Sequence, residues 1–424
     1  MTQLTLARAA SSALVSLASA AGAQSLAPPA PPTSANTPTA ALTGFESSGV
    51  PNSGAYAPKA LPIADGVALT PTLGVSLGHT DNVGLAPKAQ AQRSGVITLT
   101  PKLLATTAYR ASRYAVGYQG ELIRYPSSSR DNANNHELAA TAENVLDTRF
   151  AVNSRLSYQD KRDAAGTTDR AAGQELDHWR GLNGAVLARY GAPGAKGRLE
   201  LELGAFDKKY VNNRTTTQDA DYLSTNLAAR FGVRVMPKTT VLVEYRNTRF
   251  DYKRNVQGLD GTEQRYLVGA EWEATALTSG SFKVGYLNKD YKSPTRTGFS
   301  GLTWEGGVSW KPLTYSTVDI STGRSATDPT GNNGDYIKSS FIATSWTHQW
   351  ASYFSTRVSL VHNESDYVGT ARQDKVDTLG FSANYDFRRW VRLGASYEYS
   401  KRSSTAASFD YDRNLFSLFG EFAF

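Results

Sequence analysis

Ten ionisable residues of the 424-residue chain occupy alternate positions in otherwise apolar segments, which places them on one face of extended strands. Guanidinium and carboxylate groups in such a row hold water, ions and hydrated solutes. Against lipid, each midplane cation would cost about 2–4 kcal/mol, and the whole set would exceed the stability of a typical domain. We therefore expect an aqueous lumen lined by Arg155, Arg230, Arg234, Glu244, Arg246, Arg265, Glu271, Glu273, Arg392 and Glu398. A wall that attracts solutes and a solvated interior without selectivity are equal alternatives.

Other reactive side chains show no catalytic or metal-binding spacing. The chain has no cysteine, which excludes disulfides and thiolate metal sites. Its five histidines lack the HExxH spacing and nothing resembles a nucleophile elbow, so we expect no enzyme activity, no metal and no cofactor. The best cluster, His362 with Glu364 and Asp366, is interpreted as a strand end entering a polar loop. A hydrolase assembled from separate strands is the alternative.

The elements that must position the ten residues are strands. From residue 66 onward apolar and polar residues alternate, as in Leu199 and Leu201 against Glu200 and Glu202. Short turns alternate with long polar connections, a pattern typical of outer-membrane barrels. The short turns lie near 146–148, 237–238, 312–314 and 349–351. We predict an all-β fold over 66–424, a transmembrane antiparallel up-and-down β-barrel of about eighteen strands, with about sixteen as the alternative.

The last strand carries a further signal. Residues 414–424 read NLFSLFGEFAF, and Ser417 and Glu421 alternate with an apolar set. Phenylalanines at a chain end would stay exposed unless something apolar covered them, and lipid covers the closing strand of a membrane barrel. An internal strand of a soluble sandwich is the alternative. The predicted barrel-closing set is Phe416, Leu418, Gly420, Phe422 and Phe424.

The N-terminal region divides into two segments. Residues 1–23 combine Arg8, a small-residue apolar stretch and a final Ala21-Gly22-Ala23, which predicts a secretory signal peptide. Residues 24–65 are rich in alanine and proline and are expected to be a disordered periplasmic arm, either a plain tether or a segment that anchors a partner or lies in the pore. Beyond the first segment no run approaches the roughly 18 apolar residues of a spanning helix. The mean hydropathy of −0.40 suits a barrel with a wet interior.

Aromatic residues near strand ends are expected to form interfacial girdles. A ring of roughly 16 to 18 strands encloses more volume than side chains fill, so conduction is the expected function. No long connection is conspicuously longer than the others, which disfavours a porin narrowed by a loop folded inward. The aromatic residues assigned to the girdles are Tyr190, Tyr210, Tyr252, Tyr291, Trp310, Trp350 and Trp390.

The start of the alternating region carries a family resemblance. It reads Leu77-Gly78-His79-Thr80-Asp81-Asn82-Val83, and a second strand follows with Ile97, Leu99, Pro101 and Leu103. After a signal peptide and a proline-rich arm, this start resembles the putative beta-barrel porin family associated with exopolysaccharide and capsule biosynthesis operons of Gram-negative bacteria. The resemblance spans 66–424 in layout. It implies an outer-membrane pore for polysaccharide secretion and offers no catalytic residue to carry over.

We therefore expect a pore in the bacterial outer membrane for passive passage of a hydrophilic polymer, most simply export of an exopolysaccharide or capsular polysaccharide. The alternatives are a general or substrate-selective diffusion porin for small solutes and a closed structural or adhesion barrel. Expected partners are outer-membrane lipid, the barrel assembly machinery, the transported polysaccharide or other solute, and periplasmic export proteins. The net charge of +7 includes no dense basic run, so no nucleic-acid partner is expected.

Overall fold

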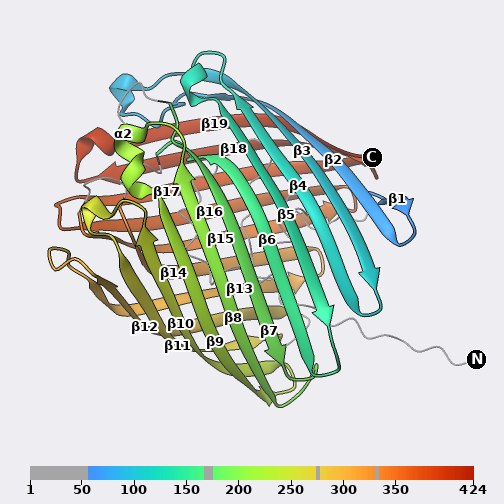
Figure 1. Cartoon of the computed structure of the whole chain (residues 1–424). Helices are drawn as coiled ribbons and strands as arrows, with labels where there is room; N and C mark the ends of the chain where they lie inside the picture. Colours follow the sequence, from blue (N-terminus) through green and yellow to red (C-terminus); the bar gives the residue numbers. More distant parts are fainter. Residues whose placement is uncertain (1–55, 167–174, 274–276, 330–333) are drawn as a thin grey trace, which may run out of the picture.

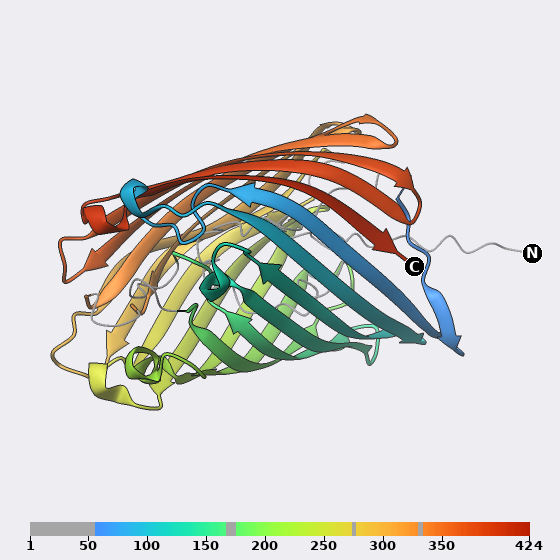
Figure 2. The ribbon, with the colours of Figure 1, turned by 90° about the horizontal axis from the view of Figure 1, so that it is seen from above.

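The computed structural model describes residues 56–166, 175–273, 277–329 and 334–424. The signal peptide predicted over 1–23 and the arm over 24–55 lie outside the described residues. Strands β2–β19 form one antiparallel sheet that curls into a closed barrel (Figures 1 and 2). Each strand pairs with the next, and β19 closes the ring on β2, with Phe416 opposite His79. The prediction of an eighteen-stranded up-and-down barrel is confirmed.

The strands are β1 Leu61–Ala64, β2 Val67–Thr80, β3 Ser94–Tyr109, β4 Ser112–Arg124, β5 Ala133–Val145, β6 Phe150–Arg162, β7 His178–Tyr190, β8 Gly197–Tyr210, β9 Tyr222–Met236, β10 Thr239–Tyr252, β11 Gly261–Trp272, β12 Thr278–Tyr291, β13 Phe299–Leu313, β14 Ser316–Thr327, β15 Tyr336–Ala351, β16 Phe354–Val368, β17 Gln373–Arg388, β18 Val391–Ser404 and β19 Tyr411–Ala423. The short helices are α2 Arg214–Thr217, η1 Lys88–Gln90, η2 Ser129–Asp131, η3 Gln218–Ala220, η4 Asn255–Gln257 and η5 Ala407–Phe409. Among the described residues no helix is both long and apolar enough to cross a membrane.

The barrel wall exposes apolar side chains on one face and buries charged side chains on the other, the reverse of the pattern in a soluble protein. Along β8, Leu199 and Leu203 are 50% and 56% exposed, whereas Glu200 and Glu202 between them are 4% and 2% exposed. Because side chains alternate along a strand, the same division repeats around the ring. We call the face with exposed apolar residues the outer face and the opposite one the inner face. An apolar outer face over a polar inner face is the arrangement of a barrel that sits in lipid.

The two ends of the barrel also differ. Connections at one end are short, including 110–111, 237–238, 314–315, 352–353 and 389–390, and the C-terminus and β1 lie at this turn end (Figure 1). Connections at the other end are longer, including 81–93, 125–132 and 211–221, and α2 lies there. In outer-membrane barrels the tight turns face the periplasm, so the loop end faces the cell exterior.

The predicted disordered arm over 24–65 extends too far, because residues 56–65 have defined positions. Leu61–Ala64 form β1, which turns back onto β2 at Gly66, where φ is 73° and glycine is unstrained. Tyr56 is fully buried, its hydroxyl donates to Glu421 Oε1 at 3.0 Å, and the Arg392 guanidinium lies 4.5 Å from its ring centroid. This segment therefore crosses the inner face at the turn end. One buried aromatic side chain supplies the anchor that composition alone does not reveal.

The predicted aromatic girdle is wrong for three of its members. Trp310, Trp350 and Trp390 are 47–59% exposed beside the short turns, as an interfacial ring requires. In contrast, Tyr210, Tyr252 and Tyr291 lie on the inner face at the loop end, and Tyr210 is 3% exposed. Their hydroxyl groups have carboxylate acceptors on that side of the wall, described below.

Candidate functional site

The inner face of β8–β13 carries a continuous band of charged side chains, here called the charged arc. Every member of the arc lies within 4.0 Å of at least one opposite charge on the same or another strand. The members are Arg198, Glu200, Glu202, Arg230, Glu244, Arg246, Glu263, Arg265, Glu271, Lys283 and Glu305.

Glu244 is the centre of the charged arc. Its carboxylate accepts hydrogen bonds from Arg230 Nε at 2.9 Å, Lys283 Nζ at 2.9 Å and Arg246 Nε at 3.0 Å. Its side chain has no exposed surface. A carboxylate in such a position stays ionic because three cations surround it, and the cations in turn depend on it.

Several pairs in the arc bridge strands that are not neighbours. Arg246 of β10 reaches Glu305 of β13 at 3.2 Å, and Arg198 of β8 reaches Glu271 of β11 at 2.8 Å. Such pairs require long side chains that lie flat along the wall. The strands also approach closely at two glycines of this face, because a Cβ at Gly269 would clash with the Phe282 carbonyl oxygen and one at Gly285 with that of Tyr266.

Leucines fill the rest of the wall beneath the ions. Leu242, Leu267 and Leu287 are on the inner face yet only 0–2% exposed. Arginine and lysine cover apolar surface with their methylene stems while their charged ends meet partners or water. The charged arc is thus a layer of ions over an apolar floor.

The ten predicted lining residues fall into three groups. Arg230, Glu244, Arg246, Arg265, Arg392 and Glu398 are buried among partners on the inner face. Arg155 and Glu271 are paired but partly exposed: Arg155 pairs with Glu137 at 2.8 Å, and the side chain of Glu271, which pairs with Arg198, is 29% exposed. Arg234 is exposed near the end of β9, and Glu273 lies just beyond the end of β11. Charged-arc members absent from the predicted set, among them Glu200, Lys283 and Glu305, show the same alternation and could have been found by it.

The inner face of β14–β16, next to the charged arc, is lined mainly by hydroxyl groups and is here called the hydroxyl arc. The Ser339 and Ser365 hydroxyls share a hydrogen bond of 2.9 Å, and Arg357 Nη2 donates to Ser345 Oγ at 2.9 Å. The hydroxyl residues of this arc are Ser321, Ser325, Ser339, Ser345, Thr347, Ser355, Ser359 and Ser365.

Aromatic rings continue the charged arc toward the loop end. Trp179, Phe206, Tyr222 and Phe250 form a row across β7–β10, with successive ring centroids 6.0–6.2 Å apart. All four belong to the inner face and are partly exposed. We call these four residues the aromatic row.

Two aspartates from the long connections accept hydrogen bonds from aromatic side chains in this region. Asp163 accepts from Tyr210 Oη and Trp179 Nε1, each at 2.8 Å. Asp328 accepts from Tyr291 Oη at 2.7 Å and Tyr252 Oη at 2.9 Å. These contacts explain why the three tyrosines face inward.

Two connections fold inward at the loop end. Ala165 and Leu176, between β6 and β7, are buried with Val83 and Leu85 of the β2–β3 connection and with Tyr411 on the inner face of β19. Similar loop lengths were therefore a poor guide to whether a connection folds inward, because inward folding depends on apolar residues within a loop and not on its length. The apolar Val83, Leu85, Ala165 and Leu176 were the available signal.

One contact shows how far this inward fold reaches. Arg402 Nη2 of β18 donates to the Gly166 carbonyl oxygen at 2.6 Å. Strands β19 and β2–β5 separate β18 from β6 along the shorter way round the wall, so the contact crosses part of the mouth. The described residues of the two connections therefore narrow the loop end.

The cluster around His362 faces the other way. His362 Nδ1 lies 2.6 Å from Asp377 and its Nε2 lies 3.5 Å from Glu364, and all three side chains are 42–63% exposed on the outer face. Within the described part of the chain, no group of three or more His, Asp or Glu side chains is placed to hold a metal ion.

A closed barrel with an apolar outer face and a charged inner face belongs to the class of bacterial outer-membrane β-barrels. Residues 67–419 match the family described as Putative beta-barrel porin 2, and the chain belongs to this family. The resemblance read from residues 77–103 is thereby confirmed, whereas the connection with polysaccharide operons stays a prediction. The protein is located in the bacterial outer membrane.

Several solved structures are similar in fold. The BenF-like porin from Pseudomonas fluorescens Pf-5 is 11% identical, with 84% of this chain and 99% of that chain covered and a TM-score of 0.47. OccK3 (OpdO) from Pseudomonas aeruginosa is 14% identical, with 85% and 97% covered and a TM-score of 0.47. The FrpB iron transporter from Neisseria meningitidis (F5-1 variant) is 10% identical, with 79% and 63% covered and a TM-score of 0.46. No curated protein is a significant match to the sequence.

Proposed function

We propose that the protein is a substrate-selective diffusion porin for small hydrophilic solutes. The observation that carries this proposal is the contact between Arg402 and Gly166 across the loop end. A mouth narrowed by packed connections suits a small solute better than a polymer chain, which needs a wide and continuous path. Polysaccharide export, the first expectation, is therefore placed second.

The two arcs supply the polar surface for such a solute. The solute would contact the charged arc on one side of the lumen. The adjoining hydroxyl arc offers it hydrogen-bond donors and acceptors without net charge. Hydrogen bonds to both can replace part of its hydration shell while it passes. Weak, multiple contacts allow both entry and exit, as a conducting pore requires.

Polysaccharide passage remains the second candidate because of the aromatic row. Partly exposed rings on the inner face offer apolar surface to the flat faces of sugar rings, next to polar groups that meet hydroxyls. A closed structural barrel is the third candidate, and conductance separates it from both pores.

The test is single-channel conductance in a planar bilayer combined with solute uptake by proteoliposomes. We expect a steady conductance, uptake of monosaccharides and amino acids, and little uptake of long oligosaccharides. Arg402→Ala should raise conductance and the size limit, because the Gly166 carbonyl loses its donor. Its control is Lys401→Ala, an exposed outer-face neighbour, which should behave as the wild type.

Three outcomes would contradict the proposal in different ways. Uptake of long oligosaccharides by the wild type would favour polysaccharide passage. No conductance from folded protein would favour the closed barrel. Equal conductance of the Arg402→Ala and wild-type channels would mean that the inward connections do not limit passage.

A further inference from the structure

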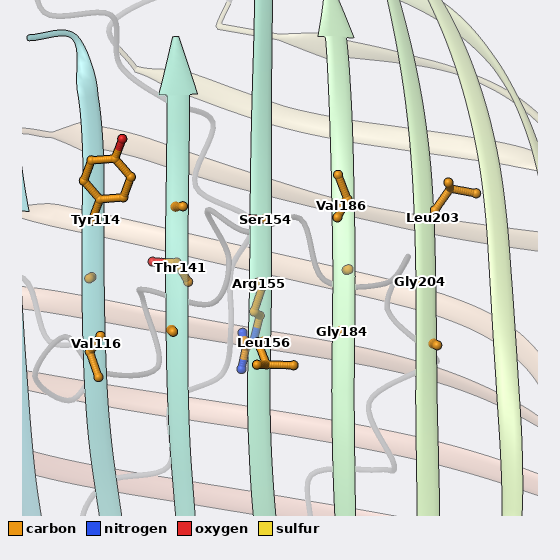
Figure 3. A pocket seen from close by; sticks show the side chains of 15 residues that line it. Tyr114, Val116, Thr141, Ser154, Arg155, Leu156, Gly184, Val186, Leu203 and Gly204 are labelled. Atoms are coloured by element: carbon orange, nitrogen blue, oxygen red, sulfur yellow. The ribbon is translucent and has the colours of Figure 1, made fainter. Parts of the chain in front are cut away.

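An apolar groove of about 730 Å³ lies in the outer face of β4–β8 (Figure 3). Small residues, including Ala140, Ser154 and Gly184, form its floor, and Leu156, Val186 and Leu203 form its sides. These side residues are 45–56% exposed, so the groove opens away from the lumen. A hollow in a lipid-facing wall must be filled by something apolar, because water there would lack hydrogen-bond partners.

A basic patch lies on the same face toward the loop end. Arg180 and Lys209 are direct cross-strand neighbours on β7 and β8, and Arg162 lies opposite His178 one row further out. Arg180 pairs with Asp160 at 2.9 Å, yet its side chain remains 56% exposed, and Lys209 is also exposed. The other nearby outer-face acid, Asp207, forms an ion pair with Lys253.

The charge of this patch is not general to the rim. At the loop ends of β15–β18, the outer-face cations Lys338 and Lys375 pair with Asp366 at 2.7 Å and with Glu364 at 3.0 Å. Asp377 adds a further acid there. The basic excess therefore coincides with the sector that holds the groove.

The distance between patch and groove matches one lipid. From Arg180 to Gly184 the strand rises about 13 Å, at about 3.3 Å per residue. This is close to one leaflet's share of a hydrocarbon core about 30 Å thick. A headgroup at Arg180 would thus send an acyl chain down to the floor of the groove.

We propose that the outer face of β4–β8 binds a phosphorylated, multiply acylated lipid of the outer leaflet. Its phosphate lies among Arg162, Arg180 and Lys209, and one acyl chain fills the groove over Gly184 and Ser154. A second copy of the chain is a poorer occupant, because a two-fold contact would bring the same cations against each other. This inference depends on the outer-membrane location and not on the proposed solute.

The test reconstitutes the full chain in phosphatidylcholine vesicles that contain a small fraction of bis-phosphorylated, hexa-acylated lipid A. The protein is then extracted in mild detergent, and retained lipid is quantified by mass spectrometry. We expect the wild type to retain lipid A, and the double variant Arg180→Glu/Lys209→Glu to retain at least about tenfold less, since each surface cation contributes about 1 kcal/mol. Dephosphorylated lipid A should be retained as weakly.

Two further variants separate the headgroup from the groove. Ser154→Leu/Gly184→Leu fills the floor without changing charge, and an added Cβ at Gly184 has only the Leu156 side chain within 4 Å, at 3.8 Å. It should also retain at least about tenfold less lipid A. The control Lys375→Glu/Lys401→Glu makes the same charge change on the other sector and should retain lipid A as the wild type does. Heat-modifiable gel migration confirms that each variant is folded.

Equal retention by the wild type and both groove-sector variants would overturn the proposal. So would equal loss in the control, which would indicate a general charge effect. Efficient disulfide cross-linking between copies that carry Gly184→Cys would assign the groove to a second copy instead.

Discussion

The charged arc and the hydroxyl arc adjoin at β13 and β14 and share one barrel geometry and one apolar outer face. They differ in the side chains that line the inner face. In the charged arc, long side chains reach across strands, as Arg246 does to Glu305. In the hydroxyl arc, short side chains such as Ser345 and Thr347 stay above their own strands. The difference shows that the lumen's chemistry is set strand by strand, while the outer face follows one rule imposed by lipid.

The two arcs also differ in how strongly their members depend on one another. Three cations share the Glu244 carboxylate, so removal of one member leaves unpaired charge. A serine hydroxyl in the hydroxyl arc carries no charge itself, so its loss leaves at most a single donor or acceptor without a partner. Substitutions should therefore have large, coupled effects in the charged arc and small, separate ones in the hydroxyl arc.

The largest effect is expected from Glu244→Gln. The variant keeps the side-chain shape but leaves Arg230, Arg246 and Lys283 without their central anion, and it should lower the free energy of unfolding by about 3 kcal/mol. Urea titration in proteoliposomes, followed by gel mobility, measures this change. The control Glu364→Gln removes an exposed outer-face partner of Lys375 and should cost less than about 1 kcal/mol. Similar losses in both variants would show that the buried network has no special role.

The second prediction concerns the floor of the charged arc. In Gly285→Ala the new Cβ would clash with the Tyr266 carbonyl oxygen, which is a backbone atom and cannot rotate away. We expect a loss of about 1–3 kcal/mol by overpacking, measured by the same titration. Gly307→Ala is the matched control, because its nearest atom would be the Ile320 carbonyl oxygen at 3.6 Å. If Gly285→Ala were as stable as that control, the close approach of β11 and β12 at this position would not require a glycine.

The strands and their two faces could be predicted from the sequence, whereas contacts between distant side chains could not. Alternation was enough to assign the strands and to place Glu200 opposite in direction to Leu199, because the two-residue period of a strand holds whatever its partners are. It could not show that Arg246 meets Glu305, since that pair depends on side-chain reach over intervening strands. Tyr210 was misplaced for a different reason: it was assigned by its place near a strand end, whereas alternation puts it on the same face as Glu200 and Glu202. The inward fold at Ala165 depends on contacts between distant connections.

A smaller effect is expected from Glu271→Gln, at the exposed margin of the charged arc. Its carboxylate pairs with Arg198 but remains 29% exposed, so its charge reaches water in the lumen. The variant should shift the reversal potential in a KCl gradient toward anion preference. The shift should shrink at about 1 M salt, where the screening length falls to about 3 Å. Glu244→Gln, with its fully covered side chain, should shift the potential less; an equal shift would mean that exposure does not govern selectivity.

The smallest effect is expected from Ser345→Ala in the hydroxyl arc. The variant removes one acceptor from the Arg357 guanidinium and should cost about 1.5 kcal/mol, the lower end for a hydrogen bond to a charged group. Neither the reversal potential nor the single-channel conductance should change, because no charge is lost and the side chain becomes only slightly smaller. A loss as large as that of Glu244→Gln, measured by the same urea titration, would mean that the two arcs are equally coupled. The contrast between them would then lie in charge alone and not in mutual dependence.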